Sequence, residues 1–146
     1  MEKLLKAKVL LVDDEEDFIR SLSQRLEVRG LKVTGATRGE EAVQLVDGQE
    51  FDAIVLDLSM PGMDGLETLK TIKDNHPEAE IIILTGHGTI KASIEAMKLG
   101  AEDFLEKPVD FKELLNKIEE ARNKRILILQ KKSKDEIQTI LKSKSW

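Results

Sequence analysis

The sequence predicts an α/β domain in which a five-stranded parallel sheet is covered by helices on both faces. Short, continuously apolar runs alternate five times with longer amphipathic stretches. The connections between these segments are short, and no long loop interrupts the alternation. Continuously apolar strands separated by helices are typical of parallel sheets, because the crossover helices bury both faces of the sheet.

The first half of the chain supplies three strands and two helices. We expect strands where β-branched and aliphatic residues run together, at residues 8–12, 31–36 and 51–58. We expect helices where apolar residues recur at helical spacing, over residues 17–30 and across residues 42–46. Gly30 is suited to stop the first helix, and Thr37 is suited to cap the second.

The second half repeats the alternation. A turn at residues 60–65 contains Pro61, Gly62 and Gly65, and a helix follows from Leu66 to a point before Pro77. A strand is expected at residues 80–84, a helix at 89–99, a short strand at 103–106 and a helix from 111 to about 125. The crossovers between successive strands should be right-handed.

Length and composition agree with one domain and a short tail. The 146 residues are 40% hydrophobic, which excludes a wholly disordered chain, and only 3% aromatic, so the core must be aliphatic. The absence of Cys excludes disulfides, thiolate metal sites and Cys nucleophiles. Since no apolar run approaches the roughly 20 residues of a membrane span, we expect a cytoplasmic protein without a membrane partner.

Charge is distributed unevenly along the chain. Residues 121–146 hold eight Lys and Arg against two Asp and Glu, whereas residues 1–120 hold 15 against 26. An acidic body suits a cation site and argues against direct nucleic acid binding by residues 1–122. We therefore expect residues 1–122 to form the domain and residues 123–146 to form a basic tail that is helical or partly disordered.

Polar side chains gather where four of the expected strands end. They are Asp13, Asp14, Asp57, Thr85 and Lys107. In parallel sheets of this kind, ligands bind beyond the carboxyl ends of the strands, so these side chains should meet at one edge. Each residue alone could be a helix cap or a solvated surface residue, and it is their convergence that indicates a site.

These residue types suit phosphoryl chemistry. Neighbouring carboxylates repel one another unless a cation lies between them, and oxygen ligands favour Mg²⁺, with Mn²⁺ as a substitute. Lys107 is a point charge for a phosphoryl group, and Thr85 can donate a hydrogen bond to it. Asp57 is then a candidate carboxylate nucleophile that forms an acyl phosphate.

Four motifs in the chain resemble those of receiver domains in two-component response regulators. The resemblance covers roughly residues 7–122 and is closest to receivers of sigma-54-dependent activators. The motifs are Asp13-Asp14, Asp-Leu-Ser-Met-Pro-Gly-Met-Asp-Gly at 57–65, Leu-Thr-Gly-His-Gly at 84–88 and Phe-Leu-Glu-Lys-Pro at 104–108. The resemblance implies a doubly wound (βα)5 flavodoxin-like fold with strand order 2-1-3-4-5.

The resemblance also implies a role for each site residue. Asp57 would be the phosphoacceptor, Asp14 a direct Mg²⁺ ligand, and Asp13 a ligand that acts mainly through a coordinated water. The backbone carbonyl of Ser59 would complete the protein ligands. The resemblance also assigns two residues that come after the fifth strand. Lys107 would pair with the phosphoryl group, and the peptide bond between Lys107 and Pro108 is expected to be cis.

The implied function is a signalling switch rather than an enzyme with an external substrate. A histidine kinase would phosphorylate Asp57, and Thr85 and Phe104 would then change the face formed by residues 89–99, 103–106 and the helix from 111. That face would contact an output domain, a target protein or a second copy of the chain. Regulation of transcription is one such output, although the chain has no nucleotide-binding motif of the G-x-x-x-x-G-K-[ST] type, and the sequence leaves open whether the receiver stands alone or is part of a longer regulator.

Two alternatives come from other classes of protein. A phosphohydrolase of the haloacid-dehalogenase type would also form an aspartyl phosphate, but it needs an Asp where this chain has Ser59, and a cap insertion. A pseudo-receiver would bind partners without being phosphorylated. All the expected functional positions are filled, which favours the switch over this interaction module.

Overall fold

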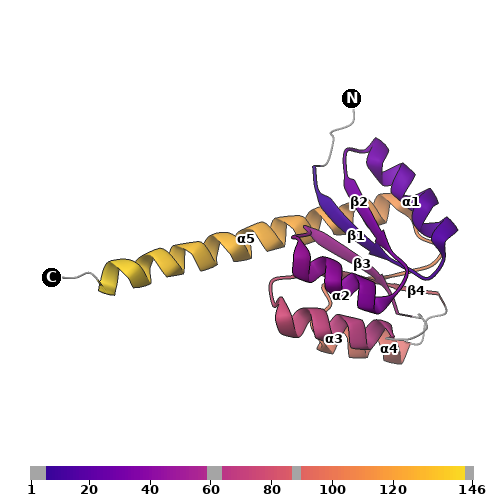
Figure 1. Ribbon diagram of the computed structural model, residues 1–146. Coiled ribbons are helices and arrows are strands. Elements are labelled where there is room, and N and C mark those ends of the chain that lie inside the picture. Colours follow the sequence, from indigo (N-terminus) through magenta and orange to yellow (C-terminus); the bar gives the residue numbers. More distant parts are fainter. Residues whose placement is uncertain (1–5, 59–63, 87–89, 144–146) are drawn as a thin grey trace.

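The computed structural model describes residues 6–58, 64–86 and 90–143. Strands and helices alternate along the chain in the order that the sequence predicts (Figure 1). The elements are β1 Lys8–Val12, α1 Glu16–Val28, β2 Lys32–Ala36, α2 Gly39–Gly48, β3 Ala53–Asp57, α3 Gly65–Asn75, β4 Ile81–Thr85, α4 Ile90–Lys98, β5 Asp103–Glu106 and α5 Phe111–Ser143.

The five strands form one parallel sheet with the order β2-β1-β3-β4-β5, which confirms the doubly wound flavodoxin-like fold. β1 lies between β2 and β3, so the direction in which strands are added reverses at β1. β1 pairs with β3 in the register Val12↔Leu56, which brings the residues that follow both strands to the same edge. Such a reversal point is where parallel sheets of this type bind ligands.

Side chains of each strand alternate between two apolar cores, one on each face of the sheet. Leu10 and Ile54 face the core that α2, α3 and α4 cover. Leu11 and Val55 face the core that α1 and α5 cover. Burying each such side chain contributes on the order of 1.5–3 kcal/mol, so the two cores hold the edge that carries the polar residues in place.

The ends of the first two helices are set by local chemistry. Gly30 follows α1 with φ of 96°, a left-handed conformation that suits glycine, and its N–H donates to the carbonyl of Glu27 at 3.0 Å. The expected stop at Gly30 is thereby confirmed. The expected cap at Thr37 is wrong: Arg38 occupies the N-cap of α2, because Thr37 and Arg38 together form the bend after β2.

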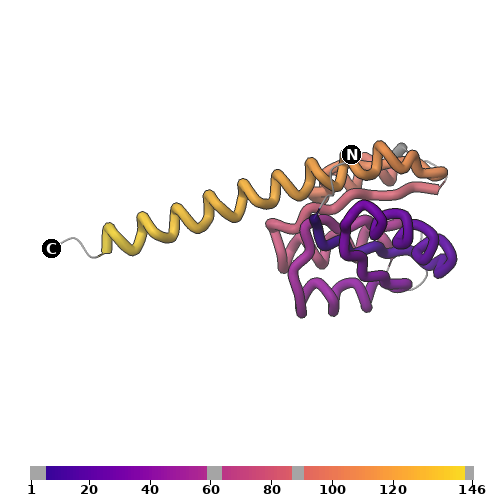
Figure 2. The backbone as a smooth tube through the Cα atoms, turned by 90° about the horizontal axis from the view of Figure 1, so that it is seen from above, coloured from indigo at the N-terminus to yellow at the C-terminus, as the bar shows by residue number. Residues whose placement is uncertain are grey.

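The last helix, α5, is longer than the sequence prediction, which placed its end near Arg125. Its first turns bury Leu114, Ile118, Ala121 and Arg125, and it then continues beyond the domain as an exposed helix to Ser143 (Figures 1 and 2). No Gly or Pro interrupts residues 126–143, so the helix has no local reason to stop. A domain boundary at residue 122 stays a prediction, since α5 runs through it without a break. Within the described ranges, neither α5 nor any other helix is long and apolar enough to cross a membrane.

Candidate functional site

Three carboxylates meet at the carboxyl ends of β1 and β3. Asp13 follows β1, and Asp57 is the last residue of β3 on the neighbouring strand. Carboxylate oxygens of Asp13, Asp14 and Asp57 all lie within 4.8 Å of one another. The structure therefore brings together the three acidic residues that the sequence predicted to converge.

Burial differs among the three. Asp13 is fully buried and Asp57 is 4% exposed, whereas Asp14 is exposed to solvent. Asp13 Oδ1 accepts a hydrogen bond from the backbone N–H of Glu15 at 2.9 Å, which fixes the orientation of the carboxylate. Two buried carboxylates at this spacing repel each other, so the site favours a compensating cation.

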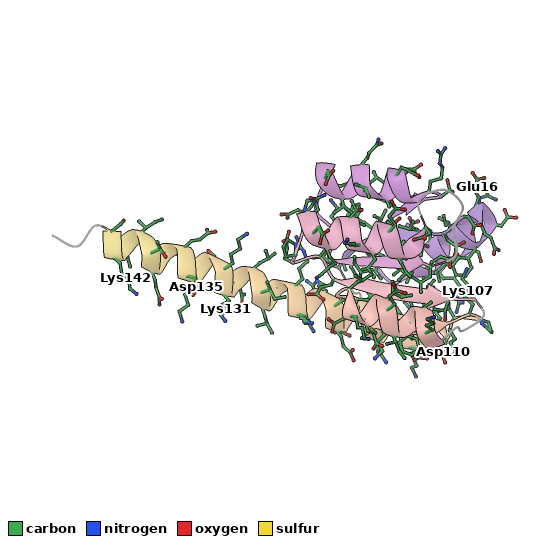
Figure 3. The ribbon with its side chains drawn as sticks, turned by 90° about the horizontal axis from the view of Figure 1, so that it is seen from below. Glu16, Lys107, Asp110, Lys131, Asp135 and Lys142 are labelled. Atoms are coloured by element: carbon green, nitrogen blue, oxygen red, sulfur yellow. The ribbon has the colours of Figure 1, made fainter. Side chains whose placement is uncertain are left out.

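Lys107 supplies one such cation from the end of β5. Its Nζ lies 2.6 Å from Asp13 Oδ2 and 3.6 Å from Asp57 Oδ2, and its backbone N–H donates to the carbonyl of Thr85 at 2.8 Å. The following peptide bond, Lys107–Pro108, is cis. Figure 3 places Lys107 at the same end of the molecule as Glu16, away from Lys131, Asp135 and Lys142 on the projecting part of α5.

The charge of Lys107 is maintained by its neighbours. Burial alone would lower the pKa of the Lys107 ammonium, but the hydrogen bond to Asp13 and the charges of Asp13 and Asp57 raise that pKa above its ordinary value. The ammonium is therefore protonated at neutral pH, with carboxylates on one side and only 18% of the side chain exposed.

Thr85 and Phe104 occupy different surroundings. Thr85 ends β4 and is 5% exposed, and its Oγ1 has no hydrogen-bond partner in the part of the chain that the structure describes. A buried hydroxyl without a partner costs free energy, so it favours a ligand that can accept a hydrogen bond from it. Phe104 lies on β5 beside Ile83 and is 41% exposed, so its ring faces outward here.

The backbone next to Asp57 requires a glycine at position 65. The N–H of Gly65 donates to the carbonyl of Leu58 at 3.2 Å. A Cβ at this position would lie 2.3 Å from Leu58 Cα and 2.7 Å from the Asp57 carbonyl oxygen. α3 therefore starts close against the end of β3, and the sequence signal for this contact is the expected turn glycine.

One neighbour of the site is not among the residues that the sequence predicted for it. Phe18 on α1 packs partly buried against the core that α1 and α5 cover, and its ring centroid lies 4.4 Å from Lys107 Nζ. The available signal was its position in the first turn of the helix that follows β1, close in sequence to Asp13 and Asp14. Ser59, whose carbonyl was expected to be a metal ligand, lies outside the described residues.

The donor set fits a hard divalent cation. All the side-chain donors are carboxylate oxygens, two of them belong to buried residues, and Lys107 offsets only part of their charge. Oxygen-only sites suit Mg²⁺ or Mn²⁺, and Mg²⁺ usually binds one or two carboxylates directly, retains waters and leaves positions for phosphoryl oxygens. A doubly wound fold with an acidic site of this kind at the β1–β3 reversal point defines a receiver-type protein.

The comparison with known families agrees with that class. Residues 9–119 match the response regulator receiver domain, so the chain belongs to this family of two-component signalling domains. It is 35% identical to the receiver domain protein of Clostridium thermocellum, whose crystal structure superimposes with a TM-score of 0.80 over 84% of this chain and 98% of that one.

Curated relatives are transcriptional regulators that are longer than this chain. The chain is 39% identical to the transcriptional regulatory protein FixJ of Bradyrhizobium diazoefficiens over 80% of its length and 57% of the relative. It is 36% identical to the C4-dicarboxylate transport transcriptional regulatory protein DctD of Pseudomonas aeruginosa over 88% of its length and 28% of the relative. The chain thus spans less than two thirds of the length of either relative.

Proposed function

We propose that the protein is a phosphorylation-activated switch in which Asp57 accepts a phosphoryl group from a histidine kinase. The observation that carries the proposal is the position of the Asp57 carboxylate, buried at the end of β3, close to Asp13 and Asp14 and 3.6 Å from Lys107 Nζ. Membership of the receiver family supports it and favours neither the phosphohydrolase nor the pseudo-receiver alternative.

Asp13, Asp14 and Asp57 would hold Mg²⁺, with the backbone carbonyl of Ser59 as a further ligand. Both oxygens of Asp13 already contact the chain, at Glu15 N and Lys107 Nζ, which favours a water-mediated role for Asp13. Asp14 is exposed and can turn an oxygen directly to the ion. When bound, Mg²⁺ would supply positive charge for the oxygens of the transferring phosphoryl group.

Phosphotransfer would then need little covalent chemistry from the protein. A carboxylate oxygen of Asp57 attacks the phosphorus of a phosphohistidine, so that an O–P bond forms while the P–N bond breaks. The electron pair of the broken bond stays on the leaving nitrogen, and the imidazole departs neutral because its other nitrogen carries a proton. Lys107 would neutralise charge on the phosphoryl oxygens, since positioning and electrostatics supply most of the catalysis in phosphoryl transfer.

Thr85 would couple phosphorylation of Asp57 to a change at the surface of the protein. Its buried hydroxyl lacks a partner among the described residues, so it can gain a hydrogen bond by moving toward a phosphoryl oxygen. That movement would open space into which the exposed ring of Phe104 can turn. Such a change is a population shift, because the acyl phosphate stabilises only the state that satisfies Thr85.

The surface that changes would be formed by α4, β5 and α5. It exposes Ile94, Met97 and Phe104, which are 50%, 40% and 41% exposed. We infer that this face binds an output domain, a separate target or a second copy, and that the output is transcriptional, as the names of the relatives suggest. The protein would act in the cytoplasm, would catalyse only its own phosphotransfer and dephosphorylation, and would not bind nucleic acid through residues 1–122.

The test is incubation of the protein with Mg²⁺ and a small acyl phosphate, followed by intact mass spectrometry over time. A single added phosphoryl group that accumulates supports the switch. Turnover of the donor without accumulation would support a phosphohydrolase, and the absence of any reaction would support a pseudo-receiver. A parallel sample with a chelator in place of Mg²⁺ controls for uncatalysed transfer.

A further inference from the structure

The ammonium of Lys107 contacts two different kinds of partner. Asp13 Oδ2 lies 2.6 Å and Asp57 Oδ2 lies 3.6 Å from Nζ. The ring of Phe18 also lies close to the ammonium, with its centroid 4.4 Å from Nζ. A cation within about 6 Å of an aromatic centroid is attracted to the ring face, more strongly where water is excluded.

The position of Phe18 is itself fixed. It is the third residue of α1 and packs against the apolar core between the sheet, α1 and α5, which includes Leu22 and Leu26. α1 is held in turn by the backbone after β1, where Glu15 N–H donates to Asp13 Oδ1. The ring and the carboxylate that flank Lys107 are therefore joined through one short segment of chain.

The side chain of Lys107 has an alternative position available. An open pocket of about 500 Å³ lies beside it, between α1 and the residues that follow β4 and β5. Ser21, Leu22, Gly86 and Val109 are among the residues that line it, together with Phe18 and Lys107. A lysine side chain is flexible and its ammonium is strongly hydrated, so without the ring contact it could turn into this pocket and away from Asp57.

We propose that Phe18 is a positioning residue that keeps the Lys107 ammonium directed at the phosphoryl group on Asp57. The inference rests on the proposed function, since it assigns Phe18 to the same site. When Mg²⁺ binds the carboxylates, or a phosphoryl group draws Lys107 away from Asp13, the contact between Lys107 and the carboxylates weakens. The aromatic ring neither titrates nor binds the metal, so its attraction for the ammonium persists through the reaction.

The competing explanation is that the ring only fills space. Phe18→Leu and Phe18→Met keep an apolar side chain but remove the ring, whereas Phe18→Tyr keeps the ring. Phe111 provides a matched control, because it packs against the same core. The cation near its ring is the guanidinium of Arg25, whose Cζ lies 4.1 Å from the ring centroid, and not Lys107. Phe111→Leu therefore removes a comparable ring that does not contact the site lysine.

The experiment measures the rate at which wild type and variants gain a phosphoryl group from a small acyl phosphate at saturating Mg²⁺. We expect Phe18→Leu and Phe18→Met to react about threefold to tenfold more slowly, because that range corresponds to a lost cation–π contact. Phe18→Tyr and Phe111→Leu should react at the wild-type rate, and Mg²⁺ affinity should be unchanged throughout. In a Lys107→Ala background, Phe18→Leu should slow the reaction no further.

Three results would overturn the inference: a wild-type rate in Phe18→Leu and Phe18→Met, equal slowing by Phe18→Tyr, or the same additional slowing when Lys107 is absent. A measurement without phosphorylation keeps this test separate from the proposed function. The ring current of Phe18 should move the Lys107 Cε proton resonances upfield, with and without Mg²⁺, and Phe18→Leu should abolish that shift. If the shift is present but Lys107→Ala reacts at the wild-type rate, the proposed role of Lys107 in phosphotransfer is wrong. The positioning role of Phe18 is then wrong as well.

Discussion

Replacing Glu80 with glutamine is expected to stabilise the protein above neutral pH and to leave its stability nearly unchanged in mild acid. Glu80 immediately precedes β4 and is 4% exposed. Burial and a hydrogen bond to the carboxyl group of Glu102 raise the pKa of Glu80 from 4.5 to about 7, although the charges of Lys124 and Lys73 oppose the shift. The folded protein therefore holds a proton that the unfolded chain has already released.

The magnitude follows from the size of that shift. A raised pKa gives a contribution to stability that is fully present below the unfolded value of 4.5 and is lost as the pH rises through about 7. At about 1.4 kcal/mol for each pKa unit, the loss has an upper limit of about 3 kcal/mol. The paired carboxyl of Glu102 shares the proton, so the measured effect should be smaller. The amide introduced by Glu80→Gln would keep a donor for Glu102 without titrating.

The assay is urea unfolding, followed by circular dichroism, between about pH 5 and about pH 8. Wild type should lose stability relative to Glu80→Gln as the pH rises from about 5 to about 7, and should change little more above that. Glu119→Gln, which removes an exposed carboxylate from α5, controls for the change in net charge. Parallel stability curves for wild type and Glu80→Gln would refute the inference that a buried, protonated carboxyl lies at this end of β4.

Three further predictions concern the site. Gly65→Ala should destabilise the protein by about 1–3 kcal/mol, because its Cβ would lie 2.3 Å from Leu58 Cα; unchanged urea unfolding would show that the loop adapts without cost. Asp14→Asn should weaken Mg²⁺ binding in calorimetry more than Asp13→Asn does, and equal, unchanged affinities would contradict the direct role of Asp14. Thr85→Val removes a buried hydroxyl without a partner among the described residues, so its stability should match or exceed that of wild type. The same variant should lose the change in amide exchange that a beryllofluoride mimic of the phosphoryl group induces, and a retained change would exclude Thr85 from the switch.

The fold could be predicted because its strands carry a strong and simple signal. Ile81–Thr85 and Ala53–Asp57 are buried along their whole length, and such continuously apolar strands are typical of a parallel sheet covered on both faces. Element boundaries were less accurate. The cap of α2 was misplaced by one residue, and α5 continues for 18 residues beyond Arg125, since its tail remains helical without a core to pack against.

Convergence of the site residues could also be predicted, because parallel strands place the residues that follow them at one edge. The contacts that these side chains make with one another and with other residues could not be predicted. Three features depend on side-chain placement across separate elements: the closer contact of Lys107 with Asp13 than with Asp57, the missing partner of Thr85 among the described residues, and the ring of Phe18 beside Lys107. Periodicity along one helix identifies Phe18 as a packing residue and carries no information about which cation lies over its ring.

The central claim is that Asp57 receives the phosphoryl group. The most direct measurement compares wild type, Asp57→Asn and Asp64→Asn by intact mass after incubation with Mg²⁺ and a small acyl phosphate. Asp64 is the matched control because its carboxylate caps α3 by accepting from Glu67 N–H at 2.7 Å, a role that Asn can also fill. The account predicts one phosphoryl group on wild type and on Asp64→Asn, and none on Asp57→Asn. Phosphorylation of Asp57→Asn at the wild-type rate would contradict it.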